Sequence, residues 1–146
     1  MTAIERSVSR ERLLTMMTAF KSTYLLRAAI ELKVFDALAE EPADSDTVAA
    51  IIRADARGTR VLLRALAAAG LLDCDGEQFE LVPGARELLV TTSPQYCGGI
   101  VRVAAGDGEW DVMRDLAGAV RNGGTPGIRY AEAYQRVFPQ VSGVLG

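Results

Sequence analysis

The sequence of 146 residues contains no histidine and only two cysteines, and both shortages restrict its chemistry. Histidine is the side chain most often used as a general base near neutral pH, and it is the commonest metal ligand. Cys74 and Cys97 have no second pair, so neither a disulfide framework nor a tetrahedral zinc site can be assembled. G-x-S-x-G and Walker motifs are also missing. We therefore expect no catalytic residue and no metal site in this chain.

Aromatic residues, basic charge and long apolar runs are scarce as well. Aromatics make up 6% of the chain and hydrophobic residues 49%, so the core must consist mainly of aliphatic side chains, which favours packed helices. Sixteen basic against 19 acidic residues give a net charge of −3, which provides no long-range attraction for nucleic acid or an anionic membrane. No run reaches the ~20 apolar residues of a membrane span, and the start MTAIERSVSRER lacks the apolar centre of a secretory signal. A mostly helical, cytoplasmic protein is expected.

The first predicted element is a long helix from Arg10 to Leu32, a stretch without glycine or proline. Its apolar residues recur at helical spacing and cover a wider surface than one small core needs. Either the domain wraps this helix itself, or a partner chain covers its second face. We favour the partner chain and expect a symmetric homodimer. The predicted interface residues are Leu13, Met16, Met17, Phe20 and Tyr24.

Three further helices are predicted between Val34 and Gly70. The first runs from Val34 to Ala39 and ends in the loop EEPADSD. The second is capped by Ser45 or Asp46 and ends near Ala54. The residues expected to face the core are Val48, Ala49, Ile51 and Ile52. The third is capped by Asp55, reaches Ala69 and is closed by Gly70 in a left-handed conformation. Its apolar positions at helical spacing are Val61, Leu62, Ala65, Leu66 and Ala69.

A β-hairpin follows this helix-turn-helix, and the combination predicts a winged-helix unit that ends near Thr92. The strands are expected at Leu71–Cys74 and Gln78–Val82, around a turn centred on Asp75 and Gly76. Pro83 ends the second strand, and a short helix follows from Ala85 to Val90.

The winged-helix order raises the alternative of a transcriptional regulator that binds DNA. The helix after Asp55 is expected to expose Arg57, Thr59, Arg60 and Arg64, and arginine is the residue type that pairs with guanine edges. The hairpin, however, carries only acidic charges where a wing would meet phosphates, namely Asp73, Asp75, Glu77 and Glu80. We therefore favour a solvated face, or salt bridges to these acids, and expect no nucleic-acid partner.

Beyond Pro94 two helices are predicted, Gln95–Ala105 and Glu109–Arg121, separated by a GDG break, and then a last helix from Arg129 to Phe138. The segment IVRVAAGDGEW could begin an S-adenosylmethionine or dinucleotide site, because glycines admit a ligand close to backbone amides. Such a fold also needs further alternating strands and helices and an acidic residue for the ribose. We favour a helix break, and predict no cofactor-binding residue.

Much of the chain resembles the N-terminal dimerisation domain of S-adenosylmethionine-dependent O-methyltransferases, which modify plant phenolics and bacterial natural products. The resemblance covers Leu13 to Gly127. It includes AA-x-EL-x-VFD-x-LA at Ala28–Ala39, R-x-LLRAL-x-x-x-GLL at Arg60–Leu72, and the tryptophan segment EWDVMRDLAGAVRNGGTPG at Glu109–Gly127. The family's catalytic domain, with D-x-G-x-G-x-G and a catalytic histidine, is missing.

The resemblance implies a mostly α fold, in which residues 1–92 form a winged-helix-like dimerisation domain with a small β-hairpin. Residues 93–146 would form a helical linker toward a catalytic Rossmann-like domain absent from this chain. The family's first helix packs against the same helix of a second subunit, which agrees with the homodimer expected above. Trp110 and Met113 could line the acceptor pocket or simply pack between helices.

In the full-length enzyme, the resemblance implies methyl transfer from S-adenosylmethionine to a small natural product. Transfer to oxygen is expected, with nitrogen and carbon left open. The chain alone is predicted to be inactive. It would be a fragment of such an enzyme, a stand-alone relative that kept only association, or a non-catalytic partner of a separate enzyme.

Overall fold

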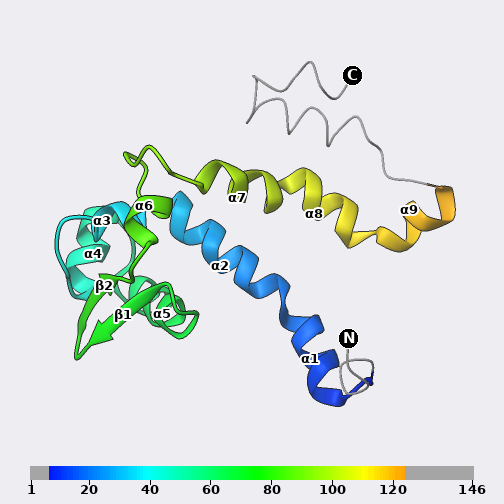
Figure 1. Cartoon of the computed structure of the whole chain (residues 1–146), viewed down its shortest axis with the longest axis horizontal. Helices are drawn as coiled ribbons and strands as arrows, with labels where there is room; N and C mark the ends of the chain where they lie inside the picture. Colours follow the sequence, from blue (N-terminus) through cyan, green and yellow to red (C-terminus); the bar gives the residue numbers. More distant parts are fainter. Residues whose placement is uncertain (1–6, 124–146) are drawn as a thin grey trace.

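The computed structural model describes residues 7–123 and consists mainly of helices (Figure 1). The one sheet in this range has two antiparallel strands, β1 and β2, so the mostly α fold class with a small hairpin is confirmed. No helix in residues 7–123 has both the length and the apolar character needed to cross a membrane. The helix predicted from Arg129 to Phe138 lies outside the described residues.

The opening helix is divided in two, which corrects the prediction of one continuous helix. Helix α1 spans Arg10–Thr18 and helix α2 spans Phe20–Glu31. The hydroxyls of Thr15 and Thr18 donate hydrogen bonds to the carbonyls of Glu11 (3.0 Å) and Leu14 (2.9 Å), and such bonds to the preceding turn tend to bend helices. Ala19, between the two helices, keeps right-handed helical dihedrals. The chain therefore bends at Ala19. Helix α1 extends from the N-terminal end of α2, away from the core (Figure 1).

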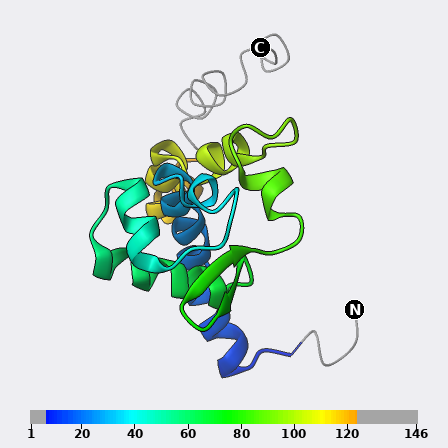
Figure 2. The same ribbon diagram turned by 90° about the vertical axis from the view of Figure 1, so that its left-hand side faces the viewer.

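The core is built by α2, α3 (Val34–Ala37), α4 (Ser45–Ile52) and α5 (Ala56–Ala68). The C-terminal end of α2, with Ala29 and Ile30, is buried in this core, whereas its N-terminal half projects from it (Figure 1 and Figure 2). Helix α2 contacts α3, α5 and α7. The predicted cap of α5 is confirmed, because Asp55 accepts a 2.8 Å hydrogen bond from the amide of Gly58. The cap of α4 is instead Asp44, which accepts from the amide of Thr47 at 2.8 Å. The largest fully buried side chains are Val34, Phe35, Leu38, Val48, Leu63 and Leu66.

Helix α5 confirms part of the predicted apolar face, because Leu66 is buried and Leu62 and Ala65 are half-buried. Thr59, Leu63 and Leu66 are its buried residues, whereas the side chain of Val61 is 62% exposed. Two residues along an α-helix correspond to a rotation of roughly 200°, so Val61 points away from the stripe that contains Thr59 and Leu63. Ile51 of α4 and Ala69 are also exposed rather than buried. Gly70 takes the predicted left-handed conformation, with φ of 81°.

The hairpin consists of β1 (Leu72–Asp75) and β2 (Gln78–Leu81). Its turn residues are Gly76 and Glu77, one position later than predicted, because Asp75 still pairs with Gln78. Gly76 has φ of 63°, the positive value that favours glycine at the first position of a two-residue turn. Phe79 is buried and exchanges two backbone hydrogen bonds with Ala43. These contacts hold the hairpin against the helical core.

After α6 (Ala85–Leu89), the chain forms α7 (Gly98–Ala104), α8 (Asp107–Arg114) and α9 (Leu116–Asn122). The helix predicted from Glu109 to Arg121 is thus interrupted, because the Asp115 carboxylate accepts from the amide of Gly118 and begins a new helix. Gly106 is the N-cap of α8, and the rest of the GDG motif lies in the first turn of α8. The segment IVRVAAGDGEW therefore lies in two successive helices, as the helix-break interpretation expected.

Candidate functional site

Helix α1 and the start of α2 carry the predicted interface residues. Helix α1 has no buried residue. The exposed fractions are 49% for Leu13, 67% for both Met16 and Met17, and 49% for Phe20, while Tyr24 is half-buried. Leu14 is also 51% exposed, so the apolar residues of α1 cover more than one face. Within residues 7–123 this surface is left largely without protein cover.

Phe20 and Tyr24 of α2 form an aromatic cluster with Trp110 of α8. The ring centroids of Tyr24 and Trp110 are 5.3 Å apart with an interplanar angle of 88°, an edge-to-face arrangement favoured by aromatic quadrupoles. The ring centroid of Phe20 lies 6.3 Å from that of Trp110 and 6.4 Å from that of Tyr24. The structure thus joins two predicted interface residues with a predicted pocket residue, a proximity that the sequence did not indicate.

A second apolar surface extends from this cluster along α8 and α9. Trp110 is 41% exposed, and Met113, Leu116 and Val120 are 53%, 49% and 74% exposed. Leu116 and Val120 were not predicted as site residues. In one continuous helix their spacing from Met113 would form a single apolar stripe, but the break at Asp115 places them on a separate helix. Figure 1 shows α1 and α9 projecting beyond the core on the same side. The aromatic cluster lies where the two apolar surfaces meet.

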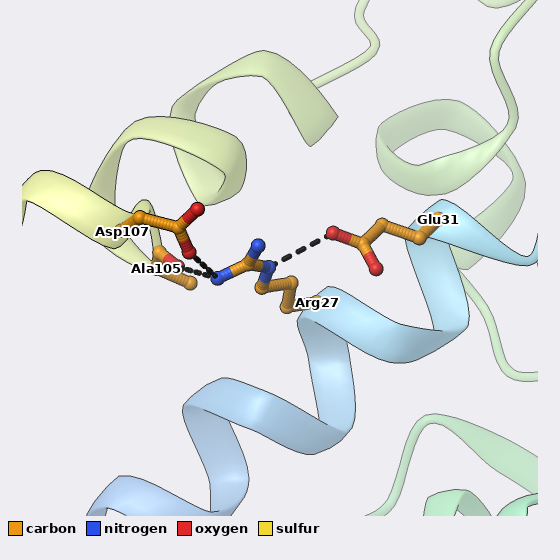
Figure 3. Close-up of polar contacts among 4 residues, drawn as sticks. All are labelled: Arg27, Glu31, Ala105 and Asp107. Carbon is orange, nitrogen blue, oxygen red and sulfur yellow. Dashed lines mark hydrogen bonds and ion pairs between the residues drawn. The ribbon is translucent and has the colours of Figure 1, made fainter. Parts of the chain in front are cut away.

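Arg27 joins α2 to the junction between α7 and α8 (Figure 3). Its Nε donates to Glu31 Oε1 at 2.9 Å, and its Nη1 donates to the Ala105 carbonyl oxygen at 2.6 Å and to Asp107 Oδ1 at 3.2 Å. The hydrogen bond to Glu31 is the largest cause of a raised pKa for Arg27. Because this pKa lies above an already high ordinary value, the guanidinium stays charged at physiological pH.

Asp36, in the VFD segment, makes a second long-range polar connection. Its carboxylate accepts two hydrogen bonds from Thr91, one from the amide and one from the hydroxyl, both at 2.8 Å. Since Thr91 follows α6, this pair fixes the segment that leads from α6 toward α7. The aspartate of the VFD segment therefore has a structural partner.

The face that would bind DNA carries charges of both signs. Arg57, Arg60 and Arg64 are exposed as predicted, but Thr59 is buried, which corrects its expected exposure. No ion pair joins these arginines to the hairpin acids within residues 7–123, although Arg60, Arg64 and Glu77 line one cavity of about 280 Å³. A cavity of about 420 Å³ between the hairpin, α6 and the loop before α4 is lined by one basic residue, Arg86, by apolar residues such as Leu38 and Val82, and by five acidic residues, Glu40, Glu41, Asp73, Glu80 and Glu87. This excess of carboxylates would repel a phosphate backbone.

In the described part of the chain, no group of three or more Cys, Asp or Glu side chains is placed to hold a metal ion. Cys74 is exposed, Cys97 is half-buried, and both are free thiols.

Comparison with known proteins identifies relatives of this chain. A family model described as "O-methyltransferase dimerisation domain" matches residues 14–91, which is more than half of the chain. The N,N-dimethyltransferase OxyT of Streptomyces rimosus is 36% identical over 89 residues, which cover 61% of this chain and 26% of OxyT.

Solved structures with the same fold include PigF with SAH, at 32% identity and a TM-score of 0.75, covering 80% of this chain and 34% of PigF. Human N-acetylserotonin methyltransferase in complex with SAM is 28% identical with a TM-score of 0.72, covering 94% of this chain and 48% of the human protein. The chain therefore spans between about a quarter and a half of the length of these relatives.

Proposed function

The chain belongs to the O-methyltransferase dimerisation domain family, and from this premise we propose that it joins two copies of a methyltransferase into a symmetric dimer. The interface would be isologous, so that Leu13, Met16, Met17, Phe20 and Tyr24 of each copy contact the same surface of the other. The observation that carries the proposal is that α1 buries none of its apolar side chains against the rest of residues 7–123. A large exposed apolar surface of this kind is typical of protein–protein contact sites.

We further propose that the second apolar surface, with Trp110 and Met113, forms one wall of a pocket for a small-molecule acceptor. Residues 1–92 would be the dimerisation domain, and residues 93–146 a helical linker toward a methyltransferase domain. S-adenosylmethionine would bind to that domain and supply the methyl group. The solved complexes of relatives with SAM and SAH support this cofactor. The family description supports oxygen as the acceptor atom, and the name of OxyT supports nitrogen.

Sedimentation equilibrium of the 146-residue chain tests the assembly role. We expect a monomer–dimer equilibrium that is mostly dimeric at micromolar concentration. A well-folded chain that remains monomeric there would overturn the proposed dimer. Isothermal titration with S-adenosylmethionine tests the division of labour, because this chain alone should show no binding, and a stoichiometric site would overturn that assignment.

A further inference from the structure

Arg27 occupies a position that links the proposed dimer helix to the proposed pocket wall. Its side chain leaves α2 and reaches residues 78 and 80 positions later in the sequence, Ala105 and Asp107 (Figure 3). Glu31, one turn further along α2, accepts from Nε and so orients the guanidinium toward these partners. Only arginine presents donors in a rigid planar fork that can serve three such acceptors together.

The contact with Ala105 is the shortest of the three and the only one of them that is partly buried. Ala105 is buried and is the C-cap of α7, so its carbonyl lies at the end of that helix, where cationic donors are favoured. The 2.6 Å hydrogen bond is charge-assisted and partly shielded from water. The side chain of Asp107, by contrast, is 89% exposed, so its ion pair with Arg27 contributes little on its own.

The turn that Arg27 holds is short and leads directly to Trp110. Gly106 follows Ala105, and its carbonyl accepts a 3.1 Å hydrogen bond from the Trp110 amide. A Cβ added at Gly106 would lie 3.0 Å from the carbonyl oxygen of Arg102, so the backbone is tightly packed here. Because this turn has little room to adjust, the position of Ala105 determines the position of the first turn of α8.

We propose that Arg27 is a positioning residue, which fixes the start of α8 against α2 and thereby sets Trp110 edge-on to Tyr24. Without Arg27, α8 would still form a helix, but the hydrogen bonds and ion pair that attach its start to α2 would be lost. The direction of α8 and α9 relative to the dimer helix would then vary. That this direction also shapes the acceptor pocket rests on the proposed function; the positioning itself does not.

The test uses Trp110, the single tryptophan of the chain, as the reporter. In Arg27→Ala we expect a red-shifted tryptophan emission, stronger acrylamide quenching and amide exchange in α8 faster by about tenfold, the change that about 1.4 kcal/mol produces. Amides of α3, α4 and α5 should exchange as in the wild type. Arg27→Lys keeps the charge but not the fork, so its exchange rate should be intermediate. The control is Lys21→Ala, which removes an exposed cation from the same helix and should leave Trp110 unchanged.

Unchanged emission and unchanged α8 exchange in Arg27→Ala would overturn the proposal. So would faster exchange that affects α8 and the core equally, since that would mean a general loss of stability. Sedimentation of the same samples separates this from the proposed function: dimeric Arg27→Ala with altered Trp110 supports positioning, while a monomeric wild type would overturn the dimer alone.

Discussion

Replacing Met17 by glutamate should separate the proposed dimer. The wild-type side chain is 67% exposed, and full burial of a methionine is worth about 1.5–3 kcal/mol, so covering the remaining surface would contribute about 1–2 kcal/mol per copy. A symmetric interface contains the substitution twice, and a buried carboxylate adds a desolvation penalty. The dimer should therefore lose at least about 3 kcal/mol, which raises its dissociation constant by at least about 100-fold.

Sedimentation velocity over a series of protein concentrations measures this change. Val61→Glu is the matched control, because Val61 is 62% exposed, is apolar and lies on α5, outside the proposed interface. Its dissociation constant should equal that of the wild type, and circular dichroism should show that both variants are folded. The reasoning is refuted if Met17→Glu dimerises as tightly as the wild type, or if Val61→Glu weakens the dimer equally.

Three further predictions concern the stability of the fold. Thr59 is 3% exposed, and its hydroxyl has no hydrogen-bond partner among residues 7–123. Thr59→Val should therefore raise the free energy of unfolding by about 1–2 kcal/mol in urea titrations, whereas Thr59→Ser, which keeps the hydroxyl, should not. Asp36→Ala should lower it by about 1–3 kcal/mol, because both hydrogen bonds from Thr91 are lost, and an unchanged midpoint would contradict this role. The hydrogen bonds from Thr47 lower the pKa of Asp44 below 3.8, so this carboxylate stabilises the fold above that pH and the contribution disappears as the pH falls through the lowered pKa. In Asp44→Asn the free energy of unfolding should therefore depend less on pH in this acidic range, and the same pH dependence as in the wild type would count against the cap.

Local signals in the sequence account for the elements that were predicted correctly. The cap at Asp55, the left-handed Gly70 and the hairpin each depend on residues within a few positions of one another, so they need no knowledge of the tertiary fold. The break at Asp115 also has a local cause, but an aspartate within an apolar helical pattern is ordinary, and only its hydrogen bond to Gly118 shows that it begins a helix.

Tertiary packing decided the features that the sequence did not predict. Thr59 was expected on the surface because it is polar, yet it lies one helical turn before the buried Leu63, on the face of α5 that packs against the core. The aromatic cluster depends on the path of the chain between Thr92 and Gly98, which brings α8 back along α2. No local pattern indicates that Trp110 contacts Tyr24, or that Arg27 reaches Ala105.

The absence of any buried residue in α1 has a consequence for how the protein acquires its structure. A helix of nine residues is marginal in water, because the cost of its first turn is recovered only through length or through packing. Within residues 7–123, one copy provides α1 with no buried contact, and α1 gains length only through the bend at Ala19 that joins it to α2. The last step of folding would therefore become bimolecular, with two copies completing each other's first helix as they meet, and the amount of protein present would then decide how much of each chain is ordered.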